Sequence, residues 1–575
     1  MTLSGGIGLD AEQGIHDPLR GEPEVERVVA QSRRWRVLGL RVDLDEPEAR
    51  LRERAAERSG IDLEAIRSLR IARRSLDARV RRGRRSLQFV VHVDVEIDGG
   101  SHGSDSMAFQ QAIRAGSVIE HPPTSPLHFE KLRESLRGSR YAVVGSGPAG
   151  LFAALALARS GVGVDVFDRG PVLAERSRSV AGFLRNRVLD PEANLLFGEG
   201  GAGTYSDGKI YTRVDHPLEP SILRELVECG APPDIAWDAR AHIGTDRLHR
   251  ILPRLRARLI DAGVTFHWST RIVGWRSEER GGQRKVVALE TESGEVGCDG
   301  VVLALGHSAL DTLEVLARQG LPLSAKPFQL GVRVEHPQAL IDRGRFGDEA
   351  IAHQLGAAYY GLSSRSGGGV AAAHSFCMCP GGQIVASVNV PGLLCTNGMS
   401  NSRHSSPFAN AALVTTLGPR EVGPEPFAGV AFREQLERSF FEAGGGDWAA
   451  PAQRVPDFIQ GKPSSEIGRT SYKLGCVPQR IDQLLPSQIR EPLRRALLHF
   501  ENQIPGFASH EATLVGIESR SSGAIRTPRH AELRTADGWS NVWPVGEGAG
   551  YAGGIMSAAI DGARSAQSLM EFCPD

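Results

Sequence analysis

The chain has 575 residues, a formal net charge of −1 and 41% hydrophobic residues. This length allows several domains, and the near-zero net charge argues against an overall field that attracts nucleic acid or membranes. No apolar run approaches the roughly 18 residues of a membrane span, and the first residues lack a signal peptide's basic start and apolar core. Seven scattered cysteines without a C-x-x-C pair favour a reducing, cytoplasmic compartment over a zinc site or a disulfide framework.

The first hundred residues predict a tail and a small domain. Residues 1–30 lack hydrophobic periodicity and predict a disordered tail. From 31 to 100, alternating runs and one helical stretch follow in the order β-α-β-β, which predicts a ferredoxin-like α+β domain. Nine arginines lie between Arg67 and Arg85. They fit a basic patch for RNA, an acidic partner or a phosphorylated ligand, or else a solvated hairpin tip. The lack of interleaved aromatic residues favours the hairpin tip.

The strongest pattern follows a predicted linker with a short helix over 101–138. An apolar strand from Tyr141 leads into Gly145, Gly147 and Gly150 in the spacing G-x-G-x-x-G, then into an Ala- and Leu-rich helix and a second strand that ends on Asp168. These glycines permit a tight turn, close approach of a pyrophosphate and close helix–strand packing. The pattern predicts dinucleotide binding, and an aspartate in this place favours FAD or NAD over NADP through a ribose contact.

Two further glycine-rich stretches are expected near the same ligand. The loop over 194–213 can wrap an anion or a flat ring, and its Asp207 and Lys209 order the loop, bind phosphate or lie on the surface. The apolar strand that begins at Gly300 ends at Gly306 and His307, which a doubly wound sheet would bring to the ligand edge. Residues 542–570 repeat the order strand, glycine-rich turn, helix.

Together these patterns predict an α/β protein with a discontinuous Rossmann-like domain. The second domain, with mixed strand-and-turn and helical segments, is expected to cover the cofactor. The predicted divisions are a tail (1–30), a small α+β domain (31–100), a linker (101–138), a dinucleotide-binding domain (139–325 and 511–575) and a substrate or cap domain (326–510).

The motifs VGSGPAG, FGEGGAGTYSDGK, HIGTD, ALGHSA, SFCMCPGG and GEGAGYAGGI resemble those of the glutathione-reductase-like FAD flavoproteins. More specifically, the chain resembles a bacterial family of FAD-dependent dehydrogenases that has no general assigned reaction. The resemblance extends from about residue 35 to near the C-terminus. One departure is Leu310, where an arginine is expected, so a contact near the flavin ring is expected to differ.

The resemblance implies roles for matching positions. The first turn would hold the FAD pyrophosphate, Glu547 the ribityl chain, and the helix that opens at Gly553 would direct its N-terminus at the flavin, where fixed donors stabilise developing negative charge. The cofactor-binding set is then Gly145, Gly147, Pro148, Ala149, Gly150, Asp168, Arg169, Gly200, Gly201, Ala202, Gly203, Thr204, Asp207, Lys209, Gly306, Gly546, Glu547, Gly553, Gly554 and Ile555.

Catalytic candidates each have a structural alternative. Cys377 and Cys379 fit a thiol relay or two small buried residues, and no glutathione-reductase-type dithiol is present near Gly200. His307 and His374 fit general acid–base groups or hydrogen-bonded structural residues. Tyr551 is expected beside the flavin. Two arginines fit an anchor for an anionic substrate, a contact with the flavin or a solvated ion pair: Arg520 and Arg526.

Three functions remain open at this point. The first is an FAD-dependent dehydrogenase that transfers a hydride to or from a small organic substrate, in metabolism or biosynthesis. The second is an FAD monooxygenase. Because only one complete G-x-G-x-x-G is present, NAD(P)H would bind transiently or the substrate itself would reduce the flavin. The third is a flavin-binding module that docks RNA or a protein through its basic domain. No metal site is expected, and neither the substrate nor the oligomeric state follows from the sequence.

Overall fold

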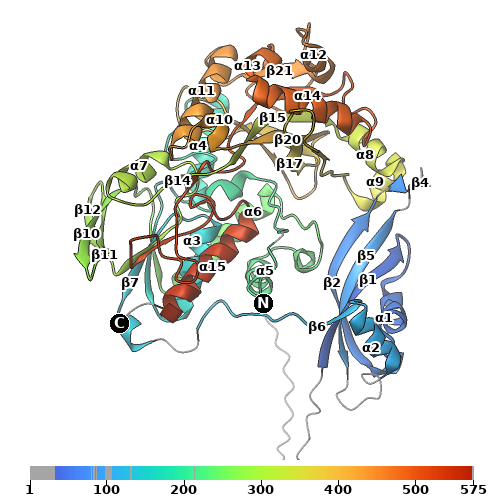
Figure 1. Ribbon diagram of the computed structural model, residues 1–575, viewed down its shortest axis with the longest axis horizontal. Helices are drawn as coiled ribbons and strands as arrows, with labels where there is room; N and C mark the ends of the chain where they lie inside the picture. Colours follow the sequence, from blue (N-terminus) through green and yellow to red (C-terminus); the bar gives the residue numbers. More distant parts are fainter. Residues whose placement is uncertain are drawn as a thin grey trace, which may run out of the picture.

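The computed structural model describes residues 33–78, 80, 81, 84, 85, 87–97, 106–129, 133–212 and 214–572. The tail predicted over 1–30 lies outside these residues, as do Arg79 and Arg82 of the arginine-rich stretch. Three sheets organise the described part: a small antiparallel one, a parallel one and a large mixed one (Figure 1).

The small N-terminal unit is a four-stranded antiparallel sheet in the order β2-β5-β1-β6. Its strands are β1 (Arg33–Asp43), β2 (Ile66–Asp77), β5 (Gln88–Ile97) and β6 (Val118–Glu120). Alternate residues of β5, such as Val91 and Val93, are buried against α1 (Leu51–Ser59) and α2 (Met107–Arg114). The segment predicted as a linker therefore contributes α2 and β6 to this unit, because short elements after residue 100 complete its core.

The parallel sheet has the order β25-β13-β7-β8-β9. Its strands are β7 (Arg140–Val144), β8 (Gly163–Phe167), β9 (Val264–His267), β13 (Gly300–Leu303) and β25 (Val542–Pro544). The first and last parts of the predicted Rossmann-like fold thus share one sheet, although almost 400 residues of sequence separate β7 from β25. All neighbouring strands run parallel, so their carboxyl ends meet at one edge.

The two faces of this sheet have different covers. Tyr141 and Val143 pack with α3 (Pro148–Arg159), α6 (Thr245–Asp261) and α15 (Ile555–Phe572). Ala142 and Val144 point the other way, into the core beside the antiparallel meander β10 (Ile272–Arg280), β11 (Gln283–Thr291) and β12 (Gly294–Gly297). Val264–His267 does not join this meander, because it pairs with β8 in the parallel sheet.

The large sheet forms the cap, shown at the top of Figure 1. Its order is β16-β17-β20-β15-β23-β21-β22. The longest strands, β15 (Phe328–Pro337) and β20 (Phe408–Leu417), lie at its centre, with β17 (Ala373–Cys379), β21 (Ala450–Arg454) and β23 (Thr513–Glu518) around them. Helices α11 (Ala428–Ala443) and α14 (Ser487–Glu501) cover it. Residues 513–518 thus pair within the cap sheet, although the sequence placed them with the dinucleotide-binding domain.

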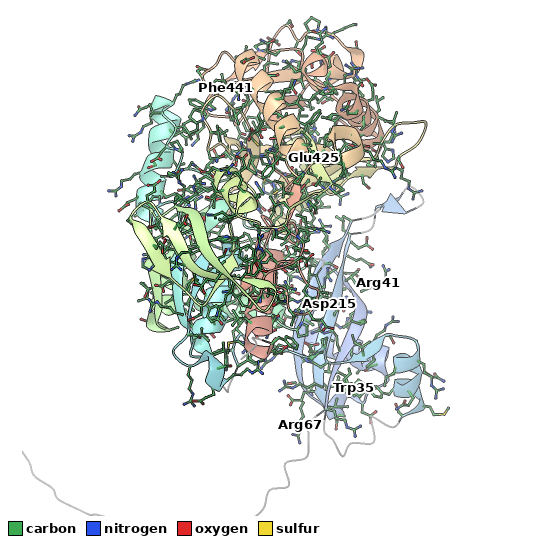
Figure 2. All side chains as sticks on the ribbon, turned by 60° about the vertical axis from the view of Figure 1, so that its left-hand side comes forward. Trp35, Arg41, Arg67, Asp215, Glu425 and Phe441 are labelled. Atoms are coloured by element: carbon green, nitrogen blue, oxygen red, sulfur yellow. The ribbon has the colours of Figure 1, made fainter. Side chains whose placement is uncertain are left out.

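The N-terminal unit is joined to the rest of the chain by its β2 strand. The amide of Arg74 donates to Trp237 O (2.8 Å) and the amide of Ala239 donates to Arg74 O (2.9 Å). The Arg74 guanidinium lies 4.5 Å from the Trp237 ring and 4.9 Å from the Phe89 ring. In Figures 1 and 2 the sheet of the unit lies between its own helices and the body of the molecule.

Candidate active site

A cavity of about 680 Å³ lies between the carboxyl edge of the parallel sheet and the cap. The ends of β7, β13 and β25 each contribute to its wall, and β17 closes it from the cap side. The structure brings together on this wall most of the residues that the sequence selected, namely Gly147, Pro148, Ala149, Ala202, Gly203, Asp207, Lys209, Gly306, His307, His374, Cys377, Gly546, Glu547, Gly553, Gly554 and Ile555.

The first turn follows β7 and starts α3. A Cβ on Gly150 would lie 1.9 Å from Gly145 O, so only glycine lets the turn fold back onto its helix. Pro148 occupies the first helical turn, where its missing N–H costs no hydrogen bond. The free backbone N–H groups of this helix start therefore face the cavity, an arrangement that favours phosphate.

The second turn touches the first directly. Gly200 N donates to Ser146 O (3.1 Å), and a Cβ on Gly201 would lie 3.1 Å from Gly147 Cα. Gly201 also has φ = +62°, which glycine adopts without strain. Thr204 is buried behind the wall, where its hydroxyl donates to Glu199 O. Gly145, Gly150, Gly200, Gly201 and Thr204 thus shape the cavity without lining it.

The third turn follows β25 and starts α15. Gly553 and Gly554 leave the N-terminus of α15 open toward the cavity. Glu547 lines the same wall, and its Oε1 atom is buried without a hydrogen-bond partner. Burial raises the pKa of Glu547 to about 8, although the charge of Lys326 acts in the opposite direction. The carboxyl is therefore mostly protonated at neutral pH and can both donate and accept a hydrogen bond.

Asp168 connects the first two turns. Its Oδ2 accepts from Ser146 N (2.8 Å) and Ser146 Oγ (2.6 Å), and its Oδ1 accepts from the amides of Gly170 (2.8 Å) and Gly198 (3.1 Å). The side chain is buried and lies outside the cavity lining. The predicted ribose contact stays a prediction, and the contacts seen here order the loops.

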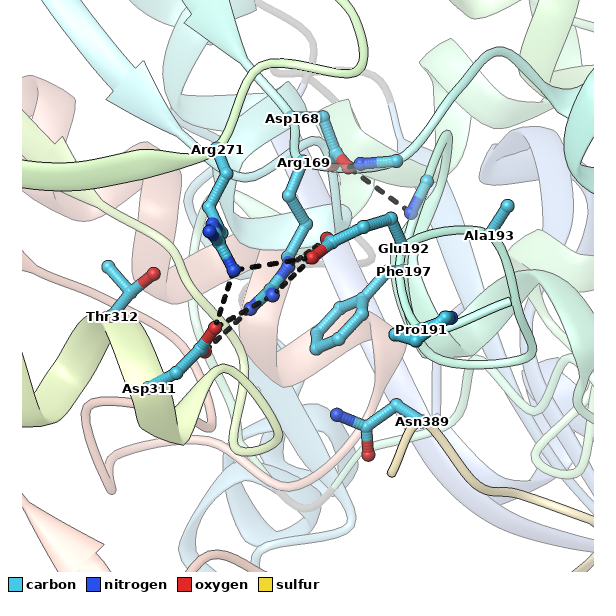
Figure 3. Close-up of polar contacts among 12 residues, drawn as sticks. Asp168, Arg169, Pro191, Glu192, Ala193, Phe197, Arg271, Asp311, Thr312 and Asn389 are labelled. Atoms are coloured by element: carbon cyan, nitrogen blue, oxygen red, sulfur yellow. Dashed lines mark hydrogen bonds and ion pairs between the residues drawn. The ribbon is translucent and has the colours of Figure 1, made fainter. Parts of the chain in front are cut away.

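Arg169 lies in a charge cluster beside the site (Figure 3). It forms ion pairs with Glu192 (2.6 Å) and Asp311 (2.7 Å), and its guanidinium lies 4.3 Å from the Phe197 ring. Arg271 joins the same two carboxylates. Arg169 was predicted to bind the cofactor. In the structure its guanidinium is paired with the two carboxylates of the cluster, and the residue does not line the cavity. Leu310 is likewise half-buried outside the lining.

The cap contributes Cys377 from a strained point of β17. Its φ is +44°, and the pairing of β17 with β20 is irregular between Phe376 and Cys379. Hydrogen bonding from the Cys379 thiol, together with the charges of Lys209 and Arg333, lowers the pKa of Cys377, although burial opposes the shift. Cys379 is fully buried behind the wall. Of the two predicted thiols, only Cys377 faces the cavity.

Lys209 and Asp207 form a buried ion pair at 2.9 Å on the cavity wall. The ammonium also donates to Met378 O, and the carboxylate accepts from Ser400 Oγ. These bonds attach the second turn to the cap. Burial opposes the charged form of Lys209, yet the pKa of Lys209 is raised because Asp207 outweighs that penalty.

The two predicted histidines line the cavity at different places. Burial, followed by the charges of Arg433 and Arg520, lowers the pKa of His307 to about 3. His307 is therefore uncharged at neutral pH and a weak base. His374 pairs its Nε2 with Gln329 Nε2 (3.1 Å).

Tyr551 does not reach the cavity lining. Its ring packs over the guanidinium of Arg529 at 3.6 Å, with Arg526 at 5.0 Å, and the residue is 36% exposed. Arg520 does line the cavity, but it is bound to Glu437 at 2.7 Å and its Nη1 donates to Asn389. Arg520 thus forms an ion pair, but a buried one and not the solvated pair that was the alternative to an anion anchor.

Several lining residues were not selected from the sequence, among them Arg240, His242, Tyr359 and His404. The rings of His242 and His404 stack with centroids 4.0 Å apart, and the Arg240 guanidinium lies 3.5 Å from the Tyr359 ring. The motif HIGTD contains His242 and was the sequence pattern from which this residue could have been selected for the site. It gave no indication that residues 160 positions later pack against it.

The residues present fit FAD. An elongated ligand with a pyrophosphate and a polyol suits two helix N-termini that face one cavity, and the unpartnered Glu547 carboxyl suits a ligand hydroxyl. Pro148 and Ala149 would hold the pyrophosphate, with Glu547 on the polyol and Gly553–Ile555 near the ring. In the described part of the chain no cluster of side chains suits a metal ion, and no helix there is long and apolar enough to span a membrane.

Comparisons with known proteins identify the segments of the chain that have relatives. Residues 327–521 match a family described as "FAD-dependent protein, C-terminal domain-like", and residues 143–202 match the NAD(P)-binding Rossmann-like domain. Residues 35–96 match a domain of unknown function. An uncharacterized protein of Clostridium beijerinckii is 34% identical over 547 residues, which cover 93% of this chain and 98% of that protein.

Solved structures show only distant likeness. Glycine oxidase from Geobacillus kaustophilus is 14% identical, with 76% of this chain and 97% of that one covered and a TM-score of 0.29. NikD, an amino acid oxidase of nikkomycin biosynthesis, is 12% identical, with 76% and 96% covered and a TM-score of 0.32. Similarities of this size say nothing about activity. From the sequence matches, the chain therefore belongs to one family with this Clostridium beijerinckii protein, and its matching segments are those of an FAD-dependent protein with a Rossmann-like dinucleotide-binding domain.

Proposed function

We propose that the protein transfers a hydride between FAD and a small organic substrate that enters the cavity from the cap side. The observation that carries this proposal is the convergence of three glycine-rich turns, far apart in the sequence, on one cavity of about 680 Å³. When bound, FAD supplies the redox chemistry, because the isoalloxazine accepts or gives two electrons with a hydride.

The chain's own residues hold the cofactor in position and exclude water from it. The N-termini of α3 and α15 offer N–H donors to the pyrophosphate and to the ring edge where negative charge develops. The protonated Glu547 holds a hydroxyl without placing a second charge near the ring. The Asp207–Lys209 pair fixes the cap against the second turn, which keeps water from the reacting face.

The proposal favours a dehydrogenase that its substrate reduces. One all-parallel sheet occurs among the described residues, and it supports a single dinucleotide site. The alternative, a monooxygenase of the same architecture, would instead require NAD(P)H as a transient reductant. We infer a cytoplasmic location from the six free cysteines of the described part. We also infer a ferredoxin-like N-terminal unit from its strand order, with no nucleic-acid partner, and keep the predicted domain boundaries as a proposal.

The test starts from purified protein and its visible flavin absorbance. Gly201→Ala and Gly116→Ala form a matched pair, because both positions have φ above +60° but only at Gly201 does the added Cβ come close to another atom. We expect Gly201→Ala to lose most bound FAD and Gly116→Ala to keep it. Anaerobic bleaching by an organic substrate without NAD(P)H supports the dehydrogenase. Oxygen incorporation with NAD(P)H consumption supports the monooxygenase, and a colourless protein that takes up no FAD refutes both.

A further inference from the structure

The charged groups on the cavity wall cancel, with one exception. Asp207 and Lys209 pair at 2.9 Å, and Arg520 pairs with Glu437 at 2.7 Å. Glu547 is mostly protonated at neutral pH, as described above. Arg240 is the remaining charged residue of the wall.

Arg240 has no carboxylate partner within 4.0 Å in the described part of the chain. Its side chain is exposed, and its guanidinium lies over the Tyr359 ring, 3.5 Å from the ring centroid. Burial raises the pKa of Tyr359 to about 12, so its phenol carries no charge that could compensate the arginine. The aromatic ring holds the guanidinium in place while its N–H donors stay available.

The neighbouring ring groups add no charge of their own at neutral pH. Burial lowers the pKa of His404 to about 4 and also lowers that of His242, so both stacked imidazoles are uncharged at neutral pH. Tyr211, which also lines the cavity, is 50% exposed. This end of the cavity therefore presents one positive charge among neutral aromatic and imidazole rings.

The segment that carries Arg240 is held from outside the cavity. Trp237 and Ala239 share backbone hydrogen bonds with Arg74 of the N-terminal unit. Asp238 Oδ1 accepts from Arg240 N at 2.9 Å, which fixes the backbone of Arg240 without involving its guanidinium. A side chain whose backbone is fixed and whose guanidinium lies on a ring, with its N–H donors available, is suited to bind a ligand.

We infer that Arg240 anchors a carboxylate of the substrate, so that the substrate class is a small organic acid. A guanidinium binds a carboxylate through two parallel N–H···O bonds, which fixes the orientation of the ligand as well as its charge. The flanking rings of Tyr359 and Tyr211 suit an apolar or aromatic remainder. This inference rests on the proposed function, because it assigns the substrate of the same site.

The experiment uses FAD-loaded protein and measures binding of benzoate, acetate and succinate by flavin difference spectra and by calorimetry. Each acid is compared with its uncharged amide. The variants are Arg240→Met, Arg240→Lys and Arg224→Met, the last being an exposed arginine on α5 (Glu219–Glu228) outside the cavity wall. We expect at least one acid to bind and its amide to bind more weakly. Arg240→Met should weaken the acid about 10-fold or more, Arg240→Lys should restore part of that loss, and Arg224→Met should change nothing.

Three results would overturn the inference. The first is that none of the acids binds to the loaded protein. The second is that Arg240→Met binds the acid as tightly as the parent. The third is that Arg240→Met loses FAD while any acid binding persists, which would assign Arg240 to a cofactor phosphate. Loss of FAD binding by the parent protein itself would instead refute the proposed function, so the two failures are distinguishable.

Discussion

Replacing Glu547 by glutamine tests the electrostatics of the third turn. Burial raises the pKa of this carboxyl from 4.5 to about 8 in the folded protein. The folded state therefore holds its proton more tightly than the unfolded state, and the protein loses stability as the pH rises from about 4.5 through about 8. Glutamine is a neutral mimic of the protonated acid and removes this pH dependence.

The size of the effect follows from the shift. At about 1.4 kcal/mol per pKa unit, the full difference corresponds to about 4–5 kcal/mol, most of which accumulates between about pH 5.5 and pH 9. Part of the side chain faces the cavity, so we expect the Glu547→Gln variant to gain at least about 2 kcal/mol over the parent across that interval. Titrations elsewhere in the chain are common to both proteins and cancel in the difference.

The assay measures the free energy of unfolding in urea, at about pH 5.5 and about pH 9, on protein freed of FAD. It compares the parent with the variants Glu547→Gln and Glu532→Gln. Glu532 is exposed and provides a matched carboxylate without burial. The reasoning is refuted if the stability difference between Glu547→Gln and the parent is the same at both pH values. It is also refuted if Glu532→Gln shows the same pH-dependent gain over the parent as Glu547→Gln.

Three further predictions concern the cavity wall and its support. Lys209→Met should destabilise the fold by about 3 kcal/mol or more in urea unfolding, and adding Asp207→Asn should recover much of the loss; a double variant no better than the single one contradicts this. Glu437→Gln strands the buried Arg433 and Arg520 and should cost about 3–5 kcal/mol, against less than about 0.5 kcal/mol for the exposed Glu442→Gln of the same helix; similar midpoints for the two would be the contrary result. Iodoacetamide at neutral pH should label Cys377 faster than the other half-buried cysteines in peptide mapping, because its lowered pKa leaves more thiolate, and uniform labelling would count against that shift.

Local sequence patterns were sufficient for the first turn. The spacing of its glycines, the apolar strand before them and the Ala-rich helix after them act within 30 residues, so the βαβ unit could be predicted. The repeated order of strand, turn and helix predicted that residues 542–570 return to the same domain, but the pairing of β25 with β13 was not predicted. Contacts between distant segments could not be predicted in the same way. Tyr551 shows the limit, because its position in a glycine-rich turn suggested the cavity, while two arginines hold its ring outside.

The cap side of the site was the least predictable. Arg240 faces Tyr359 across more than one hundred residues of sequence, and neither residue lies in a motif with a defined backbone shape. Cys377 was selected for its chemistry, but its left-handed backbone depends on the irregular pairing of β17 with β20. Such features arise from tertiary contacts between distant segments. These contacts leave no local motif or hydrophobic periodicity in the sequence from which they could be predicted.

The attachment of the N-terminal unit has a practical consequence for truncation experiments. Removing the first 135 residues would delete the strand to which Trp237 and Ala239 are hydrogen-bonded, and would expose backbone groups three residues or fewer from Arg240. A truncated enzyme would then lose substrate affinity even if the N-terminal unit bound neither RNA nor a partner protein. Exchange of single outward-facing side chains, such as Arg41, leaves that attachment intact and isolates any recruiting role of the unit.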